Sequence, residues 1–346
     1  MILLLLYLGI ILYKPLILVK TPWLIDYRSI TMIMTLMLIS RGLEFSGYIT
    51  ILAHRITTCC GGLEKLNILI IIFSMFIAAV LMNDTALFIL MPLVLAIAKI
   101  IRIDPTKIIV LTVIAVNIGS ALTPIGNPQN IIIWQYYDIN VVDFMKYTFT
   151  VFLPAIVFLI IYTLAIMPKK EFKKPQTPPL IKRDPVLALL SLTLLILTVI
   201  AAEENYTLIA LLIAIISYGI YRREIIKGLD YVLVMIFVMM FIDFRSIVFI
   251  LNIVPSNIPS LLFIESVLLS QIVSNVPATI ILLGCDWHIL LLGVNVGGVG
   301  FIAGSLANFI ALRLTGINIK DFHKITLPYF AVLVIFYYIM ALLGFI

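Results

Sequence analysis

Charged side chains are scarce in this sequence. Only 12% of its 346 residues are charged, whereas 63% are hydrophobic. A soluble domain is about 25% charged, so this chain lacks the polar surface that a soluble enzyme needs. Apolar runs recur along its whole length, and about 20 apolar residues in a helix cross the hydrocarbon core of a bilayer. The composition excludes a soluble enzyme, leaves no catalytic residue to assign, and predicts an all-α polytopic membrane protein.

Cysteine and clustered positive charge are also lacking. The three cysteines, Cys59, Cys60 and Cys285, have neither the number nor the spacing of a disulfide framework or a metal site. The net charge of +6 is spread over short loops, so nucleic acid is not an expected partner. We expect no metal and no cofactor other than a coupling ion, H⁺ or Na⁺.

The basic residues that are present predict the orientation of the chain. The longest polar segment, 168–185, is a basic linker that we place in the cytoplasm. Alternation then places four more loops there, at 41–65, 99–107, 221–230 and 313–324. These five segments hold 18 of the 23 Lys and Arg residues but only 8 of the 17 acids. Since cytoplasmic loops carry an excess of Lys and Arg, we expect a multi-pass protein of the cytoplasmic membrane.

This alternation works only if two apolar stretches enter and leave the membrane on one face. One is 66–98, interrupted at Asn83-Asp84-Thr85, and the other is 261–284, interrupted at Ser274-Asn275-Val276-Pro277. Each is predicted to be a re-entrant hairpin. Polar, non-helical backbone at membrane depth is tolerated only where protein or a water-filled cavity satisfies it. Both hairpin tips are therefore candidate sites.

An internal repeat follows the two hairpins. The pattern Asn-x-Gly-(six residues)-Gly-(three residues)-Asn begins at Asn117 and again at Asn295, 178 residues later. It predicts broken helices at 107–134 and 289–312. The charge pattern predicts opposite membrane orientations for the two repeat units, 29–167 and 230–346. An N-terminal helix and connection at 1–28 precede the first unit, and helices at 186–220 join the two units. Inverted repeats with discontinuous helices are typical of secondary transporters that work by alternating access.

The residue types in these breaks suit ions. Glycines let the backbone approach a ligand, and prolines free carbonyl oxygens that can coordinate a cation. Helix N-termini present N–H groups and a positive dipole end to an anion. The breaks therefore predict a site for a small ion and a small polar substrate.

Three stretches resemble a known family. Residues 83–92, 117–130 and 274–277 resemble the ion transporter superfamily, in particular its citrate-transporter-like and arsenite-pump/sodium–proton antiporter branch, which includes proteins called anion permeases. The resemblance implies that each hairpin tip and the broken helix after it form half of the site. It also implies a homodimer with a scaffold and a moving, elevator-like transport domain. The tips depart from the Ser-Asn-Thr pattern of dicarboxylate carriers, because the first contains an acid and the second contains Val-Pro.

Together, the repeat and the resemblance define the candidate substrate- and ion-binding residues. They are Asn83, Asp84, Thr85, Asn117, Gly119, Thr123, Gly126, Asn127, Asn130, Ser274, Asn275, Pro277, Asn295, Gly297, Gly304, Ser305 and Asn308.

Acidic residues at membrane depth are the strongest single candidates. An intramembrane acid costs at least about 2.5 kcal/mol on insertion scales, so we expect Asp84 to be buried in protein and to bind a proton or a cation. The alternative is that Asp84 only caps a helix. Glu265 is either part of the site or near the outer interface. Asp243 and Arg245 are expected to pair where the helix from 230 ends.

These observations predict an ion-coupled secondary transporter, driven by H⁺ through Asp84, that moves a small inorganic or organic anion or oxyacid across the lipid bilayer. A Na⁺/H⁺ antiporter of the same fold is one alternative. A gated channel is another, and the paired hairpins argue against it because they leave an occluded midplane site instead of a continuous pore.

Overall fold

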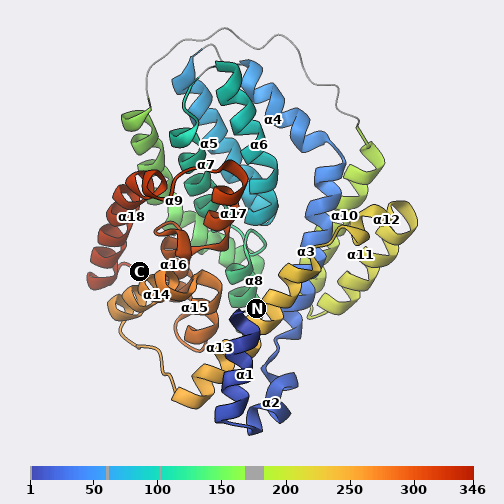
Figure 1. The fold of residues 1–346 in the computed structure, drawn as a ribbon, viewed down its shortest axis with the longest axis vertical. Helices are drawn as coiled ribbons and strands as arrows, with labels where there is room; N and C mark the ends of the chain where they lie inside the picture. The colour runs from blue at the N-terminus through green and yellow to red at the C-terminus, as the bar shows by residue number, and fades with distance from the viewer. Residues whose placement is uncertain (1, 60–61, 102, 168–182) are drawn as a thin grey trace.

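The computed structural model describes residues 2–59, 62–101, 103–167 and 183–346 (Figure 1). These ranges contain helices and no strand, which confirms the predicted all-α class. Within them, five helices are long and apolar enough to cross a membrane, and a sixth span results if the bent pair α2–α3 counts as one. Most of the predicted linker 168–185 lies outside the described residues.

Each half of the chain contains a helical hairpin. The first consists of α5 (Leu63–Val80) and α6 (Asn83–Ile101), and the second of α14 (Pro259–Val273) and α15 (Asn275–Leu282). The second hairpin turns at Ser274, whose φ of 77° is in the left-handed region. This backbone is uncommon for a side chain other than Gly or Asn, so the turn is a constrained feature of the tip.

Each hairpin is followed by a broken helix. In the first half α7 (Thr106–Ser120) ends before the break and α8 (Pro128–Tyr137) begins after it. In the second half the order is α16 (Trp287–Gly297), the short 3₁₀ helix η1 (Ile302–Gly304) and α17 (Leu306–Thr315). Hairpin and broken helix therefore occur in the same order in both halves.

Small residues hold each broken helix against its hairpin. Gly119 in α7 packs directly on the backbone of Met75 in α5. In the second half Ser266 and Ser270 of α14 face Gly293 and Gly297 of α16. Because small residues let helix backbones approach closely in a membrane, these contacts bring the breaks next to the hairpin tips.

The remaining helices surround this core. Their bounds are α1 (Ile2–Tyr13), α2 (Leu16–Leu24), α3 (Tyr27–Phe45), α4 (Tyr48–Cys59), α9 (Val141–Ile166), α10 (Pro185–Glu203), α11 (Thr207–Tyr221), α12 (Arg223–Lys227), α13 (Tyr231–Leu251) and α18 (Ile319–Leu342). In Figure 1, α3 and α10–α12 lie together on the right, while α5–α8 and α14–α18 occupy the centre and left.

The structure corrects the prediction for Asp243 and Arg245. Helix α13 continues past both residues to Leu251, and Arg245 pairs with Asp26 at 3.5 Å. Residues i and i+2 of a helix do not face each other, so these two side chains diverge. Asp243 is fully buried, and neither of its carboxylate oxygens has a hydrogen-bond partner among the described residues.

Candidate functional site

The two helix breaks meet at a cluster of five asparagines, which we call the asparagine cluster. Its members are Asn117, Asn127, Asn130, Asn295 and Asn308, and none is more than 5% exposed. Asn117 donates from Nδ2 to Oδ1 of Asn308 over 2.9 Å. Asn295 donates to Oδ1 of Asn130 over 2.8 Å and accepts from Nδ2 of Asn127 over 3.0 Å. The side chains that mark the sequence repeat are therefore in direct contact.

The hydrogen bonds of the cluster also follow the repeat. Nδ2 of Asn130 donates to the carbonyl oxygens of the residues three and six positions after Asn117, at 3.2 and 2.9 Å. Nδ2 of Asn308 donates to the carbonyls three and six positions after Asn295, both at 3.0 Å. A helix leaves its last carbonyls without partners. In both breaks the asparagine therefore satisfies one carbonyl at the end of the preceding helix and a second one within the break.

Two glycines at equivalent positions let the chain turn back on itself. A Cβ atom on Gly126 would overlap the carbonyl of Ser120, and one on Gly304 would lie 2.6 Å from the carbonyl oxygen of Gly297. Neither position accepts a side chain without a shift of the backbone. Glycine is required here because the chain passes so close to the end of the preceding helix.

The first hairpin tip is attached to the first break. The backbone N–H of Asn83 donates to the carbonyl of Gly126 over 2.8 Å, and the hydroxyl of Thr123 donates to the carbonyl of Ala79 over 2.6 Å. Asn83 is itself buried and accepts from the N–H of Asp84 over 3.0 Å. Hydrogen bonds therefore hold the first tip against the first break.

Asp84 lies at this tip but faces a different space. It is 5% exposed, and its Oδ2 has no hydrogen-bond partner among the described residues. It lines a cavity of about 90 Å³ between α3, α6 and the start of α13. The polar residues around that cavity are Arg41, Glu44, Asp84, Thr85 and Asp230. The candidate site thus has a neutral asparagine cluster and, beside the same tip, a buried acid.

The second tip presents an unpaired donor. Asn275 is 2% exposed, and its Nδ2 has no acceptor in the described ranges, although it lies near Gly298 of the second break. The Ser274 hydroxyl donates to the neighbouring Oδ1 of Asn275 over 3.4 Å, and Pro277 is buried within α15. A buried donor without a partner costs about 1–3 kcal/mol, so Asn275 is suited to meet a ligand.

Two helices begin within the site. Asn127 caps α8 by accepting from the N–H of Asn130 over 2.9 Å, and Ser305 caps α17 by accepting from Ala307 over 3.3 Å. Helix N-termini carry a partial positive charge. With neutral amides around them, these two ends supply the positive potential that an anion needs.

Sequence reasoning missed two glutamines. Gln129 donates to Oδ1 of Asn295 over 3.3 Å, and its own Oε1 is buried without a partner in the described structure. Gln271 bridges the second hairpin and the second break, donating to Gly297 over 2.6 Å and accepting from Phe301 over 2.8 Å. The sequence contains a feature that points to each of them. Gln129 lies inside the first repeated motif, and Gln271 is a polar residue one helical turn before the second tip.

Glu265 lies away from the asparagine cluster. Its Oε2 accepts the backbone N–H of Ser256 over 3.0 Å, in the connection before α14. This contact secures a loop, which fits the interfacial alternative. Across the described residues no group of three or more His, Cys, Asp or Glu side chains could hold a metal ion.

Comparison with known proteins agrees with this architecture. The citrate transporter family matches residues 1–285. The inner membrane protein YbiR of Escherichia coli is 33% identical over 304 residues, covering 85% of this chain and 81% of YbiR. The uncharacterized transporter MJ0456 of Methanocaldococcus jannaschii is 33% identical over 306 residues, covering 84% and 81%.

A solved structure shares the fold. The YdaH transporter of Alcanivorax borkumensis, described as having an unusual topology, aligns with a TM-score of 0.50 over 91% of this chain and 85% of its own, at 14% identity. The relatives and the long apolar helices together define a multi-pass transporter of the plasma membrane. The chain belongs to the citrate transporter family.

Proposed function

We propose that this transporter is a proton-coupled secondary transporter of a small anion or oxyacid. In this proposal the asparagine cluster, Asn275 and the N-termini of α8 and α17 bind the substrate, and Asp84 carries the proton. The observation that supports it most is the asparagine cluster itself, which joins two broken helices at one buried, uncharged point. No other cofactor is needed.

Alternating access follows if the two halves are inverted repeats. Contacts between the halves join Asn117 to Asn308 and Asn130 to Asn295, so exchanging the halves maps one contact onto the other. Two halves with such equivalent contacts can exchange conformations at little cost, and this exchange opens the site to one side and then the other. We include a homodimer with an elevator-like transport domain in the proposal, on the strength of the resemblance.

Asp84 suits proton transfer because burial opposes its charged form. Asp84 lines the small cavity, and its Oδ2 has no hydrogen-bond partner among the described residues, so a proton can bind there without displacing a hydrogen bond. Because the asparagine cluster is neutral, a substrate anion meets no fixed carboxylate there. Proton and substrate can then bind at neighbouring places beside one hairpin tip.

A Na⁺/H⁺ antiporter of the same fold is favoured by one observation. Glu44 and Asp230 line the same small cavity as Asp84, and carboxylate oxygens are the ligands that hard cations prefer. In that case Na⁺ and H⁺ would compete at Asp84, and no anion would be required.

The deciding experiment uses proteoliposomes with a trapped pH indicator. Citrate, other carboxylates, oxyanions, arsenite, Na⁺ and Li⁺ are added singly at two pH values. A proton-coupled anion transporter moves H⁺ in response to one of the anions or oxyacids, and Asp84→Asn abolishes that response because the amide cannot bind a proton. A response to Na⁺ or Li⁺ alone supports the antiporter.

The matched control is Asp143→Asn. Asp143 is an exposed acid that pairs with Lys146 at 3.7 Å near the start of α9, so we expect its loss to leave the proton response unchanged. Undiminished pH coupling in Asp84→Asn would contradict the role of Asp84.

A further inference from the structure

A second acid, Asp243 in α13, is buried at membrane depth without a partner. Its side chain is 0% exposed, and neither carboxylate oxygen has a hydrogen-bond partner among the described residues. Helix α13 is long and apolar enough to cross a membrane, and Asp243 lies near its middle. A buried carboxyl group that is neither paired nor hydrogen-bonded is neutralised instead of remaining charged. Burial therefore favours the protonated form of Asp243.

Asp243 points away from the N-terminal helices. Arg245 donates to the carbonyl of Leu24 over 3.1 Å, and Nζ of Lys20 lies 3.9 Å from the centre of the Phe249 ring. Arg245 and Phe249 are four residues apart and share a face of α13, which packs on α1 and α2. With 3.6 residues per turn, Asp243 lies on another side of the helix. The other helices that pack extensively on α13 are α3 and α15.

No charged side chain of these helices compensates Asp243 in the described structure. Helix α15 contains no titratable residue. In α3, Arg28 pairs with Asp138 at 3.1 Å, while Arg41 and Glu44 line the Asp84 cavity.

The other titratable residues of α1 to α3 and α13 are directed elsewhere: Tyr7 bonds Thr21, Asp26 pairs with Arg245, Lys20 lies on Phe249, and Tyr13, Tyr27 and Tyr231 are exposed. The described residues thus supply Asp243 with neither a balancing cation nor the further oxygen ligands that a hard metal cation prefers. A proton is the ion that fits this position.

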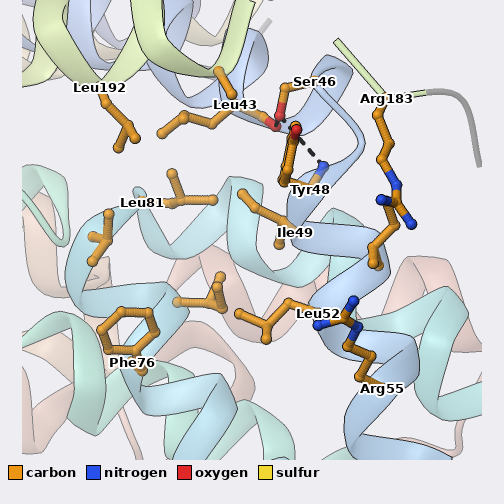
Figure 2. Close-up of a pocket in the computed structure, with 14 residues that line it drawn as sticks. Leu43, Ser46, Tyr48, Ile49, Leu52, Arg55, Phe76, Leu81, Arg183 and Leu192 are labelled. Atoms are coloured by element: carbon orange, nitrogen blue, oxygen red, sulfur yellow. Dashed lines mark hydrogen bonds between the residues drawn. The ribbon is translucent and has the colours of Figure 1, made fainter. Parts of the chain in front are cut away.

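Asp243 is also closed off from three cavities. One of about 520 Å³ lies between α3, α4, α5 and α10, where Figure 2 shows Phe76, Leu81 and Leu192 on its wall. The Asp84 cavity has about 90 Å³, and a third, of about 230 Å³, lies at the C-terminal ends of α8 and α10. Asp243 lines none of them. Because its side chain is fully buried, a proton exchanges with it only when the surrounding helices move apart.

Each half of the chain has a buried acid near the second arm of its hairpin. In the first half α6 packs against α3, and Asp84 of α6 lines the small cavity beside them. In the second half α15 packs against α13, which carries the fully buried Asp243. If the halves exchange conformations, Asp243 gains access to water and Asp84 loses it.

We propose that Asp243 is a second proton-binding site of the transport cycle. It holds its proton in this conformation and exchanges it when α15 moves relative to α13. The inference rests on the proposed function, because alternating access supplies that movement. Each cycle then takes up and releases one proton at Asp84 and one at Asp243.

Infrared spectroscopy of the purified full chain tests the protonation directly, since a protonated carboxyl group has a C=O stretching band that an ionised one lacks. We use mildly acidic pH, where exposed carboxylates are still ionised. We expect Asp84→Asn and Asp243→Asn each to remove one band. Asparagine matches protonated aspartic acid in size, so Asp243→Asn should fold. The control Asp143→Asn should retain both bands.

Transfer to D₂O separates the two acids without any variant. The band of Asp84 should shift first because this residue lines a cavity. The band of Asp243 should shift later, since exchange there requires an opening of the structure.

Proteoliposomes test the role in transport. The probe is whichever of citrate, other carboxylates, oxyanions and arsenite moves H⁺ in the wild type. The number of H⁺ moved per probe molecule should fall by about half in Asp243→Asn, because one of two proton sites is lost. Asp143→Asn should keep the wild-type ratio.

Three results would overturn the proposal: a wild-type spectrum without a slowly exchanging carboxyl band, unchanged bands in Asp243→Asn, or an active Asp243→Asn with the wild-type ratio. None of them contradicts the role of Asp84. A wild-type protein that moves no H⁺ with any probe would instead refute the proposed function, and the second proton site with it.

Discussion

At the scale of single residues, some buried side-chain amides of this protein have hydrogen-bond partners and others have none among the described residues. Asn295 accepts from Asn127 and Gln129 and donates to Asn130 and to the carbonyl of Leu291. By contrast, neither polar atom of the buried Asn67 side chain has a partner in the described residues. Removing a paired amide leaves its buried hydrogen-bond partners unsatisfied, whereas removing an unpaired amide leaves no other group unsatisfied.

This contrast predicts opposite effects of the same substitution. Asn295→Leu should lower the free energy of unfolding by about 1–3 kcal/mol for each buried group it orphans and should abolish transport. Asn67→Leu, matched in size and burial, should be neutral or stabilising. Thermal unfolding in detergent measures both, and equal destabilisation by the two variants would contradict the assignment of Asn295 as the centre of the cluster.

At the scale of helices, small residues decide how closely each broken helix approaches its hairpin. Gly119 allows α7 to pack on the backbone of Met75 in α5, and a Cβ atom there would overlap it. Backbone cannot rotate away as a side chain can, so the helices would have to separate. That separation would also move the first break away from the hairpin tip.

Gly119→Ala is therefore expected to lower stability by about 1–3 kcal/mol, the usual cost of overpacking, and to reduce transport. The control is Gly9→Ala in α1, where no atom lies within 4 Å of the added Cβ. Alanine favours a helix over glycine by up to about 1 kcal/mol, so this variant should be at least as stable as the wild type. A stable, active Gly119→Ala would show that the α5–α7 contact can relax.

At the scale of the whole molecule, the predicted inversion of the two halves has a consequence that labelling can detect. If the halves are inverted, the connections from hairpin to broken helix lie on opposite faces of the membrane. Asp104 and Asp286 mark these two connections, and each accepts a backbone N–H two residues later, from Thr106 and His288. Both are exposed, which makes them a matched pair for labelling.

Asp104→Cys and Asp286→Cys, each in a cysteine-free background, should react with a membrane-impermeant maleimide from opposite sides, Asp104→Cys from the cytoplasm. The native Cys285 is a poorer reporter, because burial raises the pKa of its thiol to about 11 and the thiolate is the reactive form. Labelling of both positions from the same side would rule out the inverted arrangement.

Sequence alone determined the class of protein and the places where its helices break. Scarce charge and long apolar runs require membrane helices, and clustered Asn, Gly and Pro break a helix between α7 and α8 and between α16 and α17, although single residues of these types, such as Pro92 and Asn67, stay within helices. These are local properties, so composition and spacing reveal them. The 178-residue repeat also marked the asparagines that the fold brings into contact.

Only the tertiary structure decided which polar atoms meet. Asn117 and Asn308 are 191 residues apart, and nothing local to either predicts their hydrogen bond. The separation of Asp84 from the asparagine cluster, the pairing of Arg245 with Asp26 instead of Asp243, and the bridging role of Gln271 likewise depend on which helix faces pack together. Packing of distant helices sets these contacts because hydrogen bonds act only over about 3 Å, a range that sequence spacing cannot specify.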